Sequence, residues 1–359
     1  MSTLETNSIG KYSGNNVSID DSLNLKSYTT TQRDALTSAA GDMIYNSTTN
    51  QVEHYNGSAW ASGTKVATLD YLIIAGGGGG GGSASNYTTG GGGGAGGYFA
   101  SYNNEASGGG DASLESISIL ADGSTTYTVT IGAGGAGGPA SHTSTGTRGS
   151  STQFYLMATG GGGGGQYQRN GQMGGSGGGA SNNVGGQNVG GASEGTVNQG
   201  FAGGIGIGYT GNSASSGGGG GGAGAVGADG SGGTGGNGGA GVASTITGSS
   251  VTRAGGGGAG AGSTGGSGGT GGGGAGSSGS GNGTAGTANT GGGGGGTYSS
   301  TGADDNASNG TGGSGVVILR WTTADATISV GAGLTSSSAT DGSDTVVTFT
   351  AGTGTITFS

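Results

Sequence analysis

Apolar residues are concentrated in a few short stretches of this chain, and the long intervals between them carry few large side chains. The two longest aliphatic stretches are "YLIIA" at 71–75 and "VVIL" at 316–319. Continuous apolar runs are typical of strands that are covered on both faces. Alternating patterns predict further strands within 113–120, 126–132 and 152–160, the first two joined by an Asp-Gly turn. The pattern therefore predicts a mainly β fold.

Residues 1–28 contain two pairs of alternating apolar positions, Val17 with Ile19 and Leu23 with Leu25. Each pair predicts a short strand with one buried face. So short and polar a segment cannot bury that face alone, and we expect it to share a core with copies of itself, as an N-terminal oligomerisation or attachment segment. The alternative is a weakly ordered tail.

Residues 29–66 predict a small β module. "DMIYN" and "QVEHYN" flank "STTN" as a hairpin, a second turn follows at "NG", and Trp60 is a candidate core residue. A one-turn helix over 32–36, capped by Thr30 or Thr31, precedes the hairpin. The adjacent Glu53 and His54 lie on opposite faces of a strand, so they make a poor acid/base pair and we expect them to be solvated or structural.

Residues 323–359 alternate as "TISV", "TVVTFT" and "TITF" around glycine-containing turns, which predicts a small C-terminal β unit. This unit is too small for a core of its own, so we expect it to pack on the rest of the chain or on sister chains. Two roles are open to it, a cap and a receptor-binding tip, and the cap is favoured.

Residues 67–322 form a glycine-rich domain, with 95 glycines among the 240 residues 76–315. Collagen is excluded because the chain has one proline and no unbroken three-residue repeat. Gly/Ser-rich sequence is otherwise typical of flexible linkers. Flexible linkers do not typically have buried strands at both ends, however, so we expect this region to be ordered.

The glycines locally keep a period of three, as in "SGGTGGNGGAG" and "TGGSGGTGG". Three residues per turn is the geometry of a polyproline-II-type helix, which has no internal hydrogen bonds. Such helices can stack to backbone contact, so that hydrogen bonds between them replace side-chain packing. We expect the X-G-G repeats on the surface of this polyglycine-II stack and the all-glycine runs in its interior, at 76–82, 90–94, 160–165, 217–222 and 291–296.

Charge and reactive residues exclude several functions. With 18 acidic and 8 basic residues, the chain has a net charge of −10 and no basic stripe, so nucleic acid and anionic membranes are not expected partners. It has no cysteine and two isolated histidines, so no metal site or cofactor is expected. Asp341 and Asp344 are expected in turns more than around a hard cation. Chance explains the G-x-S-x-G match at 174–178 in such glycine-rich sequence, and we expect no enzyme.

Several segments carry a resemblance in the same order along about 250 residues. "LDYLIIAGGGGGGG", "YTVTIGAGGAGG", "STQFYLMATGGGGGG" and "GGSGVVILRW" look like the glycine-rich domain of bacteriophage tail-fibre and receptor-binding proteins. "QRDAL", "GDMIYN" and "YNGSAW" are similar to a module of structural proteins of marine phages, including cyanophages.

No basic n-region and no apolar h-region follow Met1, which predicts synthesis in a cytosol without export. The resemblance implies a virion fibre or adhesin, made in the host cytoplasm. Such proteins are usually homotrimeric, join other fibre or tail proteins and present loops to a host cell-surface receptor, a polysaccharide or an outer-membrane protein. Related adhesins of T-even-like fibres carry polyglycine-II helices beneath variable tip loops. This chain has almost no shaft, so a distal tip, a short fibre and a capsid or neck appendage stay open.

The interruptions of the glycine runs are the candidate contact surface, because a scaffold with few side chains can recognise a partner only through them. They lie at 83–89, 166–172, 201–212 and 297–309. Their candidate receptor-binding residues, of types frequent at binding hot spots, are Tyr87, Tyr167, Arg169, Tyr209 and Tyr298. The alternative for each aromatic is a packing role at an end of the stack. A structural spacer or decoration protein and an ice-binding protein are the alternative functions.

Overall fold

The computed structural model describes residues 24–63, 65–83, 87–139, 145–182, 192–208, 214–300 and 309–359. The chain divides into two compact units, Met1–Lys65 and Val66–Ser359. Strands dominate both, so the predicted mainly β class is confirmed. The predicted strand positions Val17, Ile19 and Leu23 lie outside the described residues.

Four strands of the small unit form one sheet in the order β1-β2-β3-β4. Their bounds are β1 Ser27–Tyr28, β2 Met43–Asn46, β3 Gln51–Tyr55 and β4 Trp60–Ser62. β2 and β3 form the expected hairpin, in which Asn46 lies opposite Gln51. Trp60 is half-buried and packs on Tyr55 with the ring centroids 5.6 Å apart.

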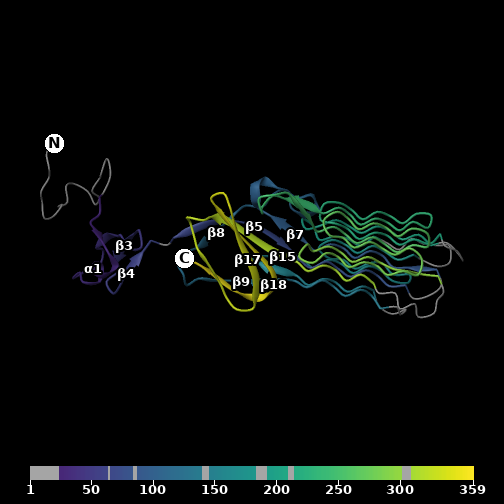
Figure 1. Ribbon diagram of the computed structural model, residues 1–359, viewed down its shortest axis with the longest axis horizontal. Coiled ribbons are helices and arrows are strands. Elements are labelled where there is room, and N and C mark those ends of the chain that lie inside the picture. Colours follow the sequence, from purple (N-terminus) through teal and green to yellow (C-terminus); the bar gives the residue numbers. More distant parts are fainter. Residues whose placement is uncertain are drawn as a thin grey trace. The chain divides into compact units, whose positions relative to one another are not determined.

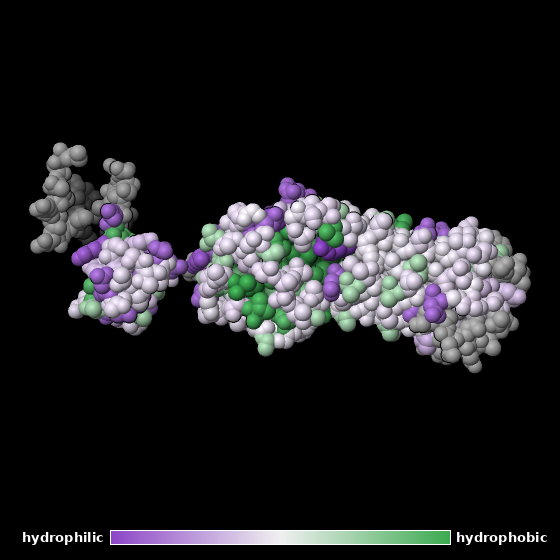
Figure 2. Space-filling view, viewed as in Figure 1, coloured by the Kyte–Doolittle hydropathy of each residue, from purple (hydrophilic) through white to green (hydrophobic). Residues whose placement is uncertain are grey.

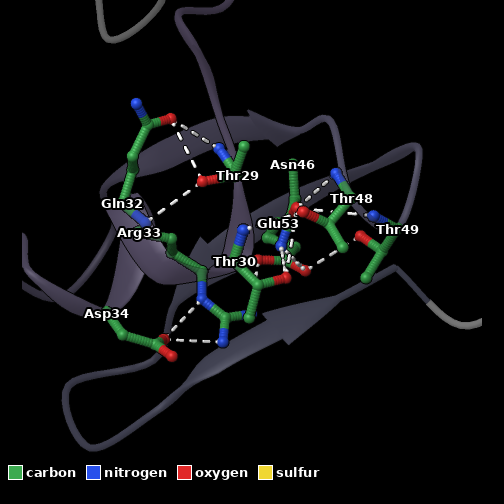
Figure 3. A network of polar contacts seen from close by, with 9 residues as sticks. All are labelled: Thr29, Thr30, Gln32, Arg33, Asp34, Asn46, Thr48, Thr49 and Glu53. Atoms are coloured by element: carbon green, nitrogen blue, oxygen red, sulfur yellow. Dashed lines mark hydrogen bonds and ion pairs between the residues drawn. The ribbon is translucent and has the colours of Figure 1, made fainter.

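The helix α1 (Thr30–Asp34) begins earlier than predicted, and its N-cap is Thr29. Thr29 Oγ1 accepts a hydrogen bond from the Gln32 amide, and Gln32 Oε1 accepts one from the Thr29 amide at 2.9 Å (Figure 3). This reciprocal capping box needs a hydroxyl residue three positions before a Gln or Glu, and at Gln32 that residue is Thr29. The predicted cap at Thr30 or Thr31 is therefore wrong.

Glu53 has a structural role, which was one of its two expected roles. Its side chain is 5% exposed and forms an ion pair with Arg33 at 2.9 Å. It also accepts hydrogen bonds from Asn46 Nδ2 at 2.9 Å and Thr49 Oγ1 at 3.2 Å (Figure 3). His54 is exposed, so the two residues form no acid/base pair.

A ten-stranded sheet lies at one end of the large unit (Figure 1). Its main path is β11-β10-β9-β18-β15-β5-β7, with β8 added to β5 and with β16 and β17 added to β18. The strands are β5 Val66–Ile74, β7 Tyr98–Ala100, β8 Ile117–Leu120, β9 Thr126–Thr130, β10 Thr152–Phe154, β11 Leu156–Ala158, β15 Val316–Thr322, β16 Ile328–Val330, β17 Leu334–Asp341 and β18 Asp344–Phe358.

Shorter elements complete the unit. β6 (Thr88–Thr89) pairs with β14 (Tyr298–Ser299), and β12 (Val242–Ser244) pairs with β13 (Val251–Arg253). Two 3-10 turns are η1 (Tyr102–Asn104) and η2 (Gly108–Gly110).

The central strands β5 and β15 are covered on both faces, as their continuous apolar runs predict. From β5, Tyr71 and Ile73 enter the larger core with Phe349 and Phe358, whereas Leu72 on the opposite face enters the core shared with the glycine-rich segments. Leu319 and Ile318 of β15 divide between the two cores in the same way.

The C-terminal residues belong to this sheet. "TVVTFT" and "TITF" are parts of one long strand, β18, whose first half pairs with β15 and second half with β9. Gly352, at φ 95°, lies between the halves, where the strand changes partners. Residues 323–359 therefore share the core of the large unit.

The structure departs from two of the predicted strand patterns. Residues 152–160 form two strands, β10 and β11, because Tyr155 adopts φ 52° and the chain reverses there. The expected Asp-Gly turn is present, since the Asp122 carboxylate accepts hydrogen bonds from the amides of Ser124 and Thr125. The strands beside it, however, pair with β5 and β18.

The glycine runs lie side by side as long segments that extend from the sheet (Figure 1). In the run 76–82, amides donate in rotation to three neighbours, residues 147–150, 310–313 and 91–94. Its carbonyls accept in rotation from three others, residues 161–164, 135–138 and 294–297. The three segments that accept from the run alternate around it with the three that donate to it, and each of these segments is hydrogen-bonded to the next. Polyproline-II dihedral angles would produce this period of three, and the angles themselves stay a prediction.

The stack has its all-glycine runs inside and its X-G-G repeats outside, as predicted. All five runs are buried. Among the X residues of the repeats, Ser231, Thr234, Asn237, Thr264, Ser267 and Thr270 are exposed. Figure 2 shows the consequence, because the surface of the stack is nearly white, whereas hydrophobic green gathers over the sheet.

Candidate binding surface at the outer end of the glycine stack

Segments far apart in the sequence meet at the end of the stack away from the sheet, which we call the outer end. It comprises residues 82–83, 87–89, 138–139, 166–170, 181–182, 297–299 and 309. β6 and β14 pair here, and the Tyr87 amide donates to the Ser299 carbonyl at 2.8 Å. Interruptions more than 200 residues apart in sequence therefore share one surface.

Asn182 joins three of these segments. Its Oδ1 accepts hydrogen bonds from the Thr89 amide at 2.7 Å and the Thr89 hydroxyl at 3.0 Å. Its Nδ2 donates to the Tyr87 carbonyl at 3.0 Å, and its own carbonyl accepts from the Gln168 amide at 3.3 Å. The Asn182 side chain is fully buried, so these bonds replace the hydration that it has lost.

A second buried group holds the other side of the outer end. Thr297 Oγ1 bonds to Asn309 Oδ1 at 2.5 Å and accepts from the Ser83 amide at 3.1 Å. Asn309 Nδ2 in turn donates to the Gly138 carbonyl. The backbone at the outer end is thus fixed by side chains that the sequence analysis missed. A usable signal exists, since Ser83, Gln166 and Thr297 are each the first residue after an all-glycine run.

Two tyrosines at the outer end have strained backbones. φ is 63° at Tyr87 and 35° at Tyr167, and Gln168 follows at 59°. The left-handed region costs a residue with a Cβ of order 1–3 kcal/mol, and such outliers cluster at binding sites and ligand clamps. The loop 166–170 is also anchored to the neighbouring segment 181–182, because the Arg169 amide donates to Ser181 Oγ at 3.1 Å.

The five candidate residues differ in what they offer to a partner. Tyr87 and Tyr167 are half-buried at the outer end, and Arg169 beside them is exposed. Tyr298 is only 2% exposed, and its burial, followed by the nearby Tyr87, raises its pKa. Tyr298 is therefore a packing residue of this chain, with no side-chain surface for a partner. Tyr209 lies outside the described residues.

Asp341 and Asp344 bind an arginine. Arg320, with 8% of its side chain exposed, forms ion pairs with Asp341 at 2.8 Å and Asp344 at 2.9 Å. Arg320 also donates to the Ile246 carbonyl and lies over the Tyr102 ring. Both carboxylates have a structural role at the β17–β18 turn, which agrees with the favoured expectation.

Neither a metal-ligand cluster nor a membrane-spanning helix occurs in the described part of the chain. No group of three or more His, Cys, Asp or Glu residues there has a geometry that could hold a metal ion. Nor does any described helix have the length and apolarity to cross a bilayer.

A family model described as a glycine-rich domain matches residues 49–322. No curated protein and no solved structure matches the chain significantly.

Proposed function

Since the chain belongs to the family of glycine-rich domains, we propose that it is a fibre or adhesin protein of a phage virion, which attaches the particle to a host cell through its outer end. One observation carries the proposal: interruptions of the glycine runs, some more than 200 residues apart in sequence, converge on one surface with exposed polar and half-buried aromatic side chains. The all-glycine runs have no side chains, so we expect recognition at the interruptions between them.

Rigidity also supports a binding role. The outer end is held by buried side chains such as Asn182 and Thr297, and each loop is anchored on a segment whose backbone is hydrogen-bonded to its neighbours. A pre-organised surface loses less conformational entropy when it binds, which favours affinity. We further propose a homotrimer on a larger fibre or tail, with the receptor a surface polysaccharide or an outer-membrane protein.

The test measures adhesion of the fluorescently labelled full-length protein to a panel of bacterial strains that includes cyanobacteria. Tyr87→Ala/Tyr167→Ala should weaken adhesion about thirtyfold or more, because loss of a hot-spot aromatic typically costs about 2 kcal/mol. Tyr155→Ala is the matched control, since Tyr155 is a 72% exposed tyrosine with φ 52° on the sheet. No adhesion to any strain, or equal adhesion by all three proteins, would favour a structural spacer or decoration protein.

Ice binding is a second candidate with an observation of its own. The X-G-G segments 234–241 and 264–270 lie side by side in register, since the amides of Gly235, Gly238 and Gly241 donate to Thr264, Ser267 and Thr270. Small, exposed residues therefore form two parallel rows on the surface. A thermal hysteresis assay on the full-length protein decides between this candidate and the adhesin.

A further inference from the structure

A groove of about 800 Å³ runs along the stack next to the outer end. One wall is the segment 145–148 and the other is 169–173, and each wall contributes one arginine, Arg148 and Arg169. Gln172 Nε2 crosses the groove to donate to Thr145 Oγ1 at 2.8 Å. The lining contains two arginines, polar side chains and Met173, and it contains no carboxylate.

These two arginines have no counter-charge among the described residues. Of the five arginines in the chain, Arg33 and Arg320 are in ion pairs and Arg253 is largely desolvated. Arg148 and Arg169 are exposed, and neither forms an ion pair within the described structure. An acidic protein thus has, in one groove, two guanidinium groups that pair with no described carboxylate.

The walls are rigid because both are hydrogen-bonded to the all-glycine segment between them. The Gly146 amide donates to Gly164, the Gly149 amide to Gly161, and the Gln172 amide to Gly163, at 2.8–3.0 Å. The segment between the walls has no side chains, so nothing projects from it into the groove.

The groove also occupies a vacant position of the stack. Amides of residues 161–165 donate in two directions, to 76–79 and to 176–179, whereas the Gly163 amide has no hydrogen-bond partner among the described residues. Around a segment of this stack, neighbours that accept hydrogen bonds from its amides alternate with neighbours that donate to its carbonyls. Both groove walls donate to the carbonyls of residues 161–164, so the position between them is the place of a third acceptor for the amides. The Gly163 N–H is therefore directed between the two walls, from a buried residue that is not itself part of the groove lining.

We propose that this groove binds the anionic groups of an acidic polysaccharide, carboxylates of uronic acids or sulfates. Two forked guanidinium groups match such oxyanions bidentately, and an open groove along a rigid wall accommodates an extended polymer. The proposal rests on the proposed adhesin function and names the class of its receptor. The described groove lining has no aromatic side chain on which bases could stack, which disfavours single-stranded nucleic acid as the source of the anion.

The experiment measures binding of the full-length protein to polygalacturonate, dextran sulfate and neutral dextran by calorimetry. The two acidic polymers should bind and neutral dextran should not, and the one with the higher affinity identifies the anion. Arg148→Gln/Arg169→Gln should lower the affinity at least tenfold, because charge-assisted hydrogen bonds are lost on both walls. Raising the NaCl concentration from 0.15 to 0.5 M should weaken binding by the wild type, since salt screens exposed charges.

Two control variants make the result specific. Lys26→Gln/Lys65→Gln removes the same charge from the small unit and should bind as the wild type does. Arg148→Lys/Arg169→Lys keeps the charge but loses the planar fork, so its affinity should lie between the wild type and the glutamine variant. All variants should unfold at the wild-type temperature, because the changed side chains are exposed or half-buried, and Lys26 and Lys65 make no ion pair with a described residue.

Several outcomes would overturn the groove proposal: no binding to either acidic polymer, equal binding by the glutamine variant, an equal loss in the lysine-to-glutamine control, or tighter binding of single-stranded DNA at the same arginines. The adhesin proposal fails separately. If cells bind the arginine variant but not Tyr87→Ala/Tyr167→Ala, adhesion stands and the groove is not its site. If no strain binds any protein, adhesion fails whatever the polymers do.

Discussion

At the scale of single residues, the absence of a Cβ is the main packing device of this protein. A Cβ built on Gly78 would lie under 3.0 Å from the Gly162 carbonyl, and similar backbone clashes occur along every interior run. Ordinary cores exclude water with interlocking side chains. Here backbone meets backbone, and the side chain that would separate them is missing.

We expect Gly78→Ala to destabilise the large unit by about 3 kcal/mol, the upper end of ordinary overpacking, because the clashing atoms are backbone and cannot rotate away. Gly281→Ala is the matched control, since its Cβ would meet nothing nearer than Ser278 O at 3.3 Å. Urea denaturation measures both. Equal unfolding midpoints for Gly78→Ala and the wild type would contradict backbone contact at this position.

Buried tyrosine hydroxyls give a second residue-level effect. Burial, followed by the nearby Tyr155 and Asp70, raises the pKa of Tyr71 to about 12. The folded state therefore holds this proton more tightly than the unfolded state, whose tyrosines titrate near pH 10. The stability linked to Tyr71 is complete below about pH 10 and is lost as the pH rises through about 12.

The unfolding midpoint in urea should accordingly fall between pH 10 and 12, and it should fall less steeply in Tyr71→Phe. Tyr167→Phe is the control, because Tyr167 lies at the outer end of the stack and is not among the groups that raise the pKa of Tyr71. Parallel pH profiles for the wild type and Tyr71→Phe would show that another group controls alkaline unfolding.

At the scale of elements, long strands hold together parts that are distant in sequence. β18 pairs with β15, β9, β16 and β17, and β5 pairs with β15, β7 and β8. Arg320 reinforces this junction, since one guanidinium joins β15 to both ends of the β17–β18 turn and to Ile246.

Arg320→Gln should destabilise the large unit by about 2 kcal/mol, because it breaks charge-assisted hydrogen bonds and leaves two carboxylates unpaired. Asp341 and Asp344 keep 46% and 25% of their side chains exposed, so water limits the loss. Arg320→Lys should recover part of the lost stability, because lysine restores the positive charge but not the planar, forked guanidinium group. Thermal unfolding compares the three proteins, and an unchanged midpoint for Arg320→Gln would argue against a structural ion pair.

At the scale of the whole molecule, the proposed assembly is a trimer joined through residues 1–28. These residues alternate apolar and polar positions but are too few to bury one face alone. Light scattering of the full-length protein at micromolar concentration should therefore give about three times the chain mass of 32.7 kDa.

Val17→Asp/Ile19→Asp should shift this mass to that of a single chain, because charged residues cannot enter a shared apolar core. Thr234→Asp/Thr264→Asp is a control with the same charge change on the surface of the stack. A monomeric wild type, or trimers in all three proteins, would contradict assembly through this segment.

Local pattern by itself determined the mainly β class, the hairpin over residues 43–55, the two-face burial of β5 and β15, and the interior position of the all-glycine runs. These features depend on side-chain periodicity or on its absence, and both can be read directly from the sequence. The sequence also located the interruptions, although the role of Tyr298 as a packing residue was left open.

Only the tertiary structure decided which segments became neighbours. Hydrogen bonds between glycine runs are made by backbone groups that every residue has, so no residue type records that 76–82 lies against 310–313 or that Asn182 meets Thr89. The same reason hid the groove, which Arg148 and Arg169 both line although they lie 21 residues apart in the sequence. Composition made the stack possible, and three-dimensional packing placed the few side chains that can bind.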